Sequence, residues 1–122
     1  MSNKHYRSTG RVKVNLESRW CGYFEQQYGN VCDLSIGGCF ILTSGEVMPM
    51  ELIEIEIELT TDRWLRLWGQ VAYFVTDIGF GVCFTGVDEE THDSIVRFID
   101  GALEHGALLA AQDEIRVGEA YP

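Results

Sequence analysis

The sequence lacks an apolar run long enough to cross a membrane. Its longest uncharged stretch, between Asp33 and Glu46, contains polar residues and is shorter than the roughly 20 apolar residues of a membrane-spanning helix. The amino end, Met1 to His5, leads into polar residues and not into the apolar segment of a signal peptide. We therefore expect a cytoplasmic protein without membrane insertion and, at 122 residues, a single domain.

Metal-binding and redox motifs are also missing. The four cysteines include no C-x-x-C pair, and the three histidines supply no zinc-binding spacing. We expect no metal site. Because the cysteines stand in strand-like runs, where a free thiol behaves as a small apolar side chain, we interpret them as buried and reduced, with a disulfide or redox role as the alternative: Cys21, Cys32, Cys39 and Cys83.

No catalytic motif is recognisable. The sequence has no H-E-x-x-H, no G-x-x-x-x-G-K-[S/T] and no G-x-G-x-x-G, and no Ser/His/Asp set in a suggestive context. Gly79-Phe80-Gly81 fits the entry to a strand, and His92 and Asp93 fit a polar helix surface. We expect no enzymatic activity, no catalytic residue and no cofactor.

Positive charge is scarce and is concentrated at one end of the chain. Lysine and arginine number 9 against 19 acidic residues, which gives a net charge of −10. Residues 1–19 carry a net +4, and residues 20–122 carry a net −14. An acidic body of this kind repels nucleic-acid polymers and anionic lipid, whereas a short basic arm suits a compact anion. A solvated basic tail that binds nothing is the alternative.

Alternation of apolar and polar residues predicts six strands. It is strongest in residues 51–59, where Ile53, Ile55 and Ile57 alternate with glutamates, as expected of a half-buried antiparallel strand. The glutamates are interpreted as a solvated face that discourages edge-to-edge pairing. The other predicted strands are 11–24, 31–36, 39–43, 64–75 and 80–85, and the predicted turns are 26–30, 44–49, 60–62 and 77–79.

The fourth and fifth predicted strands also indicate their own register. A three-residue loop at 60–62 places Ile57 opposite Leu65 and Glu56 opposite Arg66, which is a favourable cross-strand ion pair. A shift of one residue would break both matches, because it turns every side chain to the other face.

The periodicity becomes helical after residue 86. Asp88 to Thr91 form an acidic helix start, and apolar residues recur at helical spacing up to Leu103. Glycines at 101 and 106 weaken this helix, and residues 107–115 are expected to continue it. The predicted fold class is all-β dominated (β plus a C-terminal α): a flexible basic arm at 1–10, an antiparallel six-stranded barrel with its helix at 11–104, and a helical extension and tail at 105–122.

Two polar clusters point to a binding site. Asp33 and Ser35 project from the same face of an extended strand and precede a glycine pair, while Arg7 and Arg11 stand in the basic arm. Arginine holds phosphate, or the O6/N7 edge of guanine, through two hydrogen bonds, and a carboxylate accepts from the N1 and N2 hydrogens of guanine. Together they describe a guanine-nucleotide site. The alternative is that these residues serve only a turn and local hydrogen bonds.

The pattern Arg7-Ser-Thr-Gly-Arg11 followed by Asp33-Leu-Ser35-Ile-Gly-Gly38 resembles the R-x-x-x-R … D/N-x-S-x-x-G signature of PilZ domains, receptors for the bacterial second messenger cyclic di-GMP. The likeness covers about residues 5–104. It implies a six-stranded barrel with a carboxy-terminal helix. It also implies that the arginines grip phosphate and guanine, that Asp33 and Ser35 bind the guanine edge, and that Gly38 keeps the backbone bend.

Two positions depart from the family pattern. Tyr73 matches a position from which an aromatic ring often stacks on the second guanine, but strand alternation places it on the side of Val71, which is predicted to face inward. Tyr6 stands where relatives that bind a stacked ligand dimer often have arginine, so one bound cyclic di-GMP is favoured.

The expected function is therefore a non-enzymatic bacterial receptor for cyclic di-GMP. Its arm orders over the nucleotide and creates a surface for a downstream protein effector. The alternative is a PilZ-like protein–protein interaction module with weak or no nucleotide binding, acting through residues 51–58 or through Trp64 and Trp68. A small nucleic-acid-binding barrel is disfavoured by the acidic body.

Overall fold

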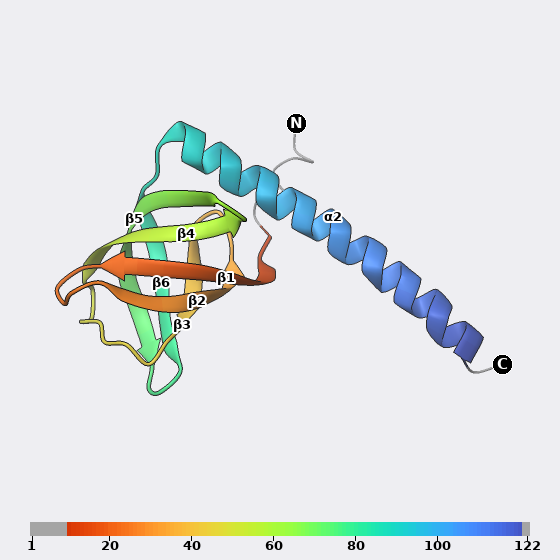
Figure 1. Ribbon diagram of the computed structural model, residues 1–122, viewed down its shortest axis with the longest axis horizontal. Coiled ribbons are helices and arrows are strands. Elements are labelled where there is room, and N and C mark those ends of the chain that lie inside the picture. Colours follow the sequence, from red (N-terminus) through yellow and green to blue (C-terminus); the bar gives the residue numbers. More distant parts are fainter. Residues whose placement is uncertain (1–9, 121–122) are drawn as a thin grey trace.

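Six strands and one helix make up the computed structural model, which describes the backbone of residues 10–120 and the side chains of residues 10–105. The expected flexible arm, residues 1–10, lies outside the described part except for its last residue. The elements, shown in Figure 1, are β1 (Val12–Cys21), β2 (Gln27–Leu34), β3 (Gly38–Leu42), β4 (Leu52–Thr60), β5 (Arg63–Val75), β6 (Gly79–Gly86) and α2 (Glu89–Ala120).

The strands form a closed barrel in the order β1-β2-β3-β6-β5-β4, and every neighbouring pair is antiparallel. Pairing of β1 with β4 closes the sheet, so that no strand of the barrel is an edge strand. The predicted fold, a six-stranded antiparallel barrel with a carboxy-terminal helix, is confirmed.

The barrel interior is filled by the apolar residues of the alternating patterns. Ile53, Ile55 and Ile57 are at most 1% exposed, and Trp20 packs edge-to-face on Phe80 with ring centroids 5.1 Å apart. Full burial of each such side chain contributes about 1.5–3 kcal/mol before conformational entropy is counted. The period-2 pattern therefore determines which face of each strand points inward.

The two ends of the barrel differ. At one end, here called the helix end, β2, β4 and β6 finish and α2 passes along the barrel before continuing beyond it, as Figure 1 shows. Ile95 and Ile99 of α2 are buried in the core cluster. At the other end, here called the open end, lie the connections 22–26, 43–51 and 76–78.

The register predicted for β4 and β5 is confirmed, but the turn between them is shorter than predicted. Ile57 pairs with Leu65 and Glu56 with Arg66. Thr60 also pairs with Arg63. The connection is therefore a two-residue turn with an extra residue in β4, which restores the predicted register.

The turn predicted at residues 26–30 is wrong. The chain reverses at residues 22–26, and Gly29 lies within β2. A Cβ atom on Gly29 would stand 2.7 Å from the carbonyl oxygen of Leu42. This glycine therefore permits close approach of β2 and β3. In the sequence alone, such a glycine cannot be told from one that marks a turn.

The cysteines are free, but the prediction that all four are buried is wrong. Cys39 is 2% exposed and Cys32 is half-buried, whereas Cys21 and Cys83 lie on the surface. Burial, with smaller contributions from Cys32 and Asp33, raises the pKa of the Cys39 thiol to about 12.

Helix α2 begins at the predicted acidic segment. The backbone N–H of Thr91 donates to Oδ1 of Asp88 at 2.7 Å, which caps the helix and lowers the pKa of that carboxyl. The helix continues without interruption past Gly101 to Ala120. Within the described residues, no helix combines the length and apolar character needed to cross a bilayer.

Candidate functional site

Arg11 and Asp33, one from each half of the predicted site, are in contact. Nε of Arg11 donates to Oδ1 of Asp33 at 3.0 Å, across the first residues of β1 and the last residues of β2. The Arg11 side chain is 57% exposed, so the ion pair itself contributes at most about 1 kcal/mol to stability. Its terminal guanidinium nitrogens have no hydrogen-bond partner among the described residues. Arg7 lies outside the described part of the chain.

Ser35 is turned into the β2–β3 connection and not outward beside Asp33. Its Oγ donates to the carbonyl oxygen of Gly38 at 3.2 Å, and its backbone N–H donates to the same oxygen at 2.9 Å. The residue is 9% exposed. The Ser35 hydroxyl proton is therefore used in a local hydrogen bond, which the sequence analysis gave as the alternative to a role in binding.

Gly38 is required by close packing. A Cβ atom at this position would stand 2.1 Å from the carbonyl oxygen of Val82 in the paired strand β6. No described glycine has a positive φ, so the expected backbone bend does not depend on the left-handed region. A hydrogen bond of 2.9 Å from the backbone N–H of Phe84 to the carbonyl oxygen of Gly37 holds the β2–β3 connection against β6.

Tyr73 faces outward, and the expectation that it shares the inward side of Val71 is wrong. Val71 pairs with Val82, but Tyr73 pairs with Gly81, so Ala72 is an extra residue in β5. This bulge reverses the alternation, and Tyr73 is 54% exposed. Its ring lies over Gly81, where a Cβ atom would stand 2.4 Å from a ring carbon.

One row of cross-strand pairs connects these outward positions. Lys13 pairs with Asp33, Asp33 with Phe40, Phe40 with Gly81, and Gly81 with Tyr73. The rings of Phe40 and Tyr73 are 5.9 Å apart across the glycine and tilted by 34°. Four strand spacings make the row about 19 Å long.

Phe40 is the member of this row that the sequence analysis did not identify. It reads as an ordinary core aromatic in an apolar run, but the structure leaves it half-buried on the outer face of β3. The pairing irregularity at Cys32 in β2 sets it opposite Asp33. The sequence signal was its position between two apolar residues, Cys39 and Ile41. Both are buried, and because successive side chains of a strand point to opposite faces, the side chain between them points outward.

The row combines complementary chemistry. Cations, Arg11 and Lys13, lie at the β1 side of Asp33, and two aromatic rings lie at its other side. Guanidinium and ammonium groups attract phosphate, a carboxylate accepts from base N–H groups, and aromatic rings stack on bases. The arrangement suits an extended ligand with anionic and flat aromatic parts.

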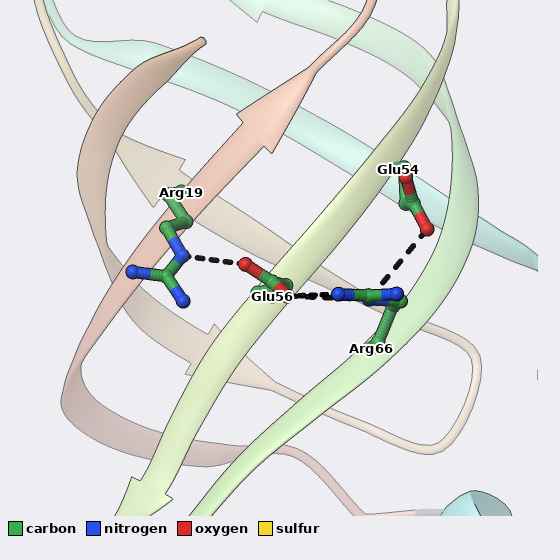
Figure 2. Close-up of polar contacts among 4 residues, drawn as sticks. All are labelled: Arg19, Glu54, Glu56 and Arg66. Carbon is green, nitrogen blue, oxygen red and sulfur yellow. Dashed lines mark hydrogen bonds and ion pairs between the residues drawn. The ribbon is translucent and has the colours of Figure 1, made fainter.

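A separate polar network occupies the outer face of β1, β4 and β5 (Figure 2). Arg19 and Arg66 both contact Glu56, at 2.5 and 2.9 Å, and Arg66 also lies 3.7 Å from Glu54. Hydrogen bonds from Arg19 and then Arg66 lower the pKa of Glu56. The guanidinium of Arg19 stacks 4.3 Å from the ring of Trp64. Both arginines are thus neutralised here and are not available to the row.

Among the described residues, no group of three or more His, Cys, Asp or Glu side chains is placed to hold a metal ion.

The sequence matches the family model described as PilZ domain over residues 4–101. It matches no curated protein.

Three solved structures resemble the fold. The Bacillus subtilis inhibitor of motility (MotI/DgrA) gives a TM-score of 0.66 at 12% identity, covering 73% of this chain and 47% of the other. The PilZ domain of CeSA from a cellulose-synthesizing bacterium gives 0.62 at 19% identity, covering 80% of this chain and 100% of the other. MrkH of K. pneumonia in its apo state gives 0.59 at 16% identity, with 85% and 52% covered. The chain thus spans about half the length of the first and third of these proteins, and the likeness to all three is one of fold.

Proposed function

Because the chain belongs to the PilZ domain family, we propose that it is a non-enzymatic receptor for the bacterial second messenger cyclic di-GMP. The family and its fold support a receptor or effector module of this class. The observation that carries the assignment to this chain is the 3.0 Å contact between Arg11 and Asp33. It brings one residue of each half of the signature together on the outer surface of the barrel.

In the proposed complex the ligand replaces the contact between Arg11 and Asp33. The carboxylate of Asp33 accepts from N1–H and N2–H of one guanine, and the freed guanidinium of Arg11 holds phosphate or the O6/N7 edge. Tyr73, with Phe40 beside it, supplies a stacking surface for a base. Ser35 and Gly38 keep the β2–β3 turn in place, and the lone pairs of the Ser35 hydroxyl remain to accept from the ligand.

The arm completes the proposed mechanism. Arg7 contributes a second guanidinium, and residues 1–10 order over the nucleotide when it binds. The composite surface of arm and ligand then recruits a downstream protein effector in the cytoplasm, by a shift of population toward the ordered state. Binding neutralises two phosphates, so the affinity falls as the salt concentration rises.

Calorimetry with cyclic di-GMP tests this function. A charge-assisted hydrogen bond contributes about 1.5–3 kcal/mol, so Arg7→Ala and Arg11→Ala should each weaken binding by about 10- to 150-fold. Arg97→Ala is the matched control, because Arg97 is an exposed arginine on α2 outside the row. Unchanged affinity in both site variants would contradict the proposal.

A protein-interaction module with weak or no nucleotide binding is the second candidate. The exposure of Trp68, 48%, and of Trp64, 36%, on the outer face of β5 favours it. Titration with cyclic di-GMP, GTP, a linear dinucleotide and single-stranded RNA, followed by amide NMR, separates the two. Shifts confined to residues 5–11, 33–40 and 73–81 with cyclic di-GMP alone support the receptor, and no shifts with any of them support the module.

A further inference from the structure

A cleft of about 480 Å³ lies at the open end of the barrel, between the connections 22–26, 43–51 and 76–78. Helix α2 packs at the opposite end, so no described helix covers this one. Its lining is mixed: apolar side chains come from several elements (Phe24, Val47, Phe74, Val75 and the buried Phe80), and polar ones lie beside them (Thr43, Ser44, Glu46, Thr76 and Asp77).

Large apolar side chains are exposed around this cleft. Phe74 is 54% exposed and Ile78 is 51% exposed, and both belong to the β5–β6 hairpin that forms one wall. Met48 and Met50 are exposed on the connection that forms the opposite wall. Apolar clusters of this kind on a soluble domain mark interaction sites, and methionine adapts to partners of different shape.

The walls of the cleft are held in place before any partner binds. The carboxylate of Glu51 accepts from the backbone N–H of Tyr23 and, at 2.6 Å, from that of Met48, so it ties two connections together. The amide of Gln27 exchanges two hydrogen bonds with the backbone of Glu46, at 2.6 and 2.7 Å. A cleft that is already ordered loses little conformational entropy on binding.

Every charged residue in the three connections is acidic. They contain Glu25, Glu46, Glu51 and Asp77 and no lysine, arginine or histidine. Glu51 is used internally, as described above. Glu25, Glu46 and Asp77 form no ion pair with any residue that the structure describes.

We propose that the open end is a docking site for a protein segment in which large apolar side chains are flanked by lysine or arginine. The exposed apolar side chains in and around the cleft contact the former, and the unpaired carboxylates attract the latter. A second copy of this chain is a poor occupant, because two acidic rims repel each other. The site lies at the end of the barrel away from α2, and its existence does not depend on nucleotide binding.

The test uses a short synthetic peptide of repeated Leu-Lys-Lys triplets, with two control peptides in which serine replaces leucine or glutamate replaces lysine. Amide NMR of the full chain should show shifts in residues 22–26, 43–51 and 74–80 with the first peptide only. Shifts elsewhere, no shifts, or equal binding of the glutamate peptide would overturn the proposal.

Variants sharpen the result. Phe74→Ser and Ile78→Ser should each weaken binding of the Leu-Lys-Lys peptide about tenfold, and both side chains are exposed enough that the barrel should fold without them. The double variant Glu46→Lys, Asp77→Lys should weaken it similarly and gain affinity for the glutamate peptide. Glu90→Lys, a charge reversal of the same kind on the exposed first turn of α2 and away from the cleft, should leave binding unchanged.

Sedimentation of the chain without peptide tests the other possible occupant of the open end, a second copy of the chain. A monomer at the concentrations used for NMR supports the proposal. Self-association that Ile78→Ser abolishes would assign the open end to a second copy and overturn it.

Discussion

The ring of Tyr73 occupies the space in which a side chain at Gly81 would begin, since a Cβ atom there would stand 2.4 Å from the ring. The glycine therefore lets the ring lie flat on the sheet beside Phe40. At Gly38 the atom that a Cβ would meet is a backbone carbonyl, that of Val82. Gly81 thus leaves room for the Tyr73 ring, whereas Gly38 leaves room for the pairing of β3 with β6.

This difference gives the first prediction. Gly81→Ala should move the exposed Tyr73 ring and cost less than about 1 kcal/mol of unfolding free energy, whereas Gly38→Ala must separate β3 from β6 and should cost about 3 kcal/mol or more. Urea unfolding of both variants measures this. Equal destabilisation would show that the Tyr73 ring is not free to move.

Stacking by the two rings gives the second prediction. Base–aromatic stacking contributes about 1–3 kcal/mol per base, so Tyr73→Ala should weaken cyclic di-GMP binding by about 5- to 150-fold. Phe40→Ala, which removes the ring that supports Tyr73, should weaken it in the same direction. Calorimetry measures both, with Trp68→Ala as the control for loss of an exposed ring on β5. Full affinity of Tyr73→Ala would exclude this face as the stacking surface.

The network around Glu56 gives the third prediction. Because hydrogen bonds from Arg19 and Arg66 lower its pKa in the folded state, the unfolded chain binds its proton more readily. Stability from this group is therefore present above the ordinary value of 4.5 and is lost as the pH falls through the lowered one.

Urea unfolding of the wild type and Glu56→Gln at several pH values tests it. The difference between them should be largest at neutral pH and should shrink as the pH falls below 4.5. Glu17→Gln, a change on an exposed residue of β1, should show little difference at any pH. A difference that grows in acid would contradict the assigned direction.

The buried thiol gives the fourth prediction. With a pKa of about 12, Cys39 stays protonated and unreactive at neutral pH, while the exposed Cys21 and Cys83 should react with iodoacetamide. Mass spectrometry after timed labelling should find Cys39 modified only in denaturant. Labelling of Cys39 at the rate of Cys83 would contradict its burial.

The same shift has a consequence for alkaline stability. Since the folded-state pKa is raised from 9.0, the contribution of Cys39 is complete below pH 9 and is lost progressively between 9 and about 12. Cys39→Ala, compared with the wild type by urea unfolding, should flatten that part of the curve.

Regular alternation made much of the fold predictable from the sequence. Residues 51–59 indicated both their inward face and their register, because a slip of one residue would expose Ile55 and bury Glu56. The side on which Tyr73 lies was not predictable, because one extra residue at Ala72 reverses the alternation and leaves no mark in composition. Gly29 was misread for a related reason: a glycine needed for close strand packing looks like a glycine needed for a turn.

The candidate site was predictable in its types of residue and less so in its geometry. The pairing of Arg11 with Asp33 follows from charge and from the nearness of the ends of β1 and β2. The inward turn of Ser35 depends on two hydrogen bonds to one carbonyl, and no pattern of side chains encodes it. Phe40 joins the row through two cross-strand neighbours, Asp33 in the same hairpin and Gly81, which is far away in the sequence.

Closure of the barrel restricts how this domain can recognise other proteins. Each strand already has a neighbour on both sides, so no whole strand edge is free for a partner to extend the sheet, as happens in domains with a free edge. Side chains on the outer surface and the connections at the two ends therefore offer the larger surfaces for recognition. Surface substitutions can therefore remove one binding activity at a time, while the sheet that supports the others stays unchanged.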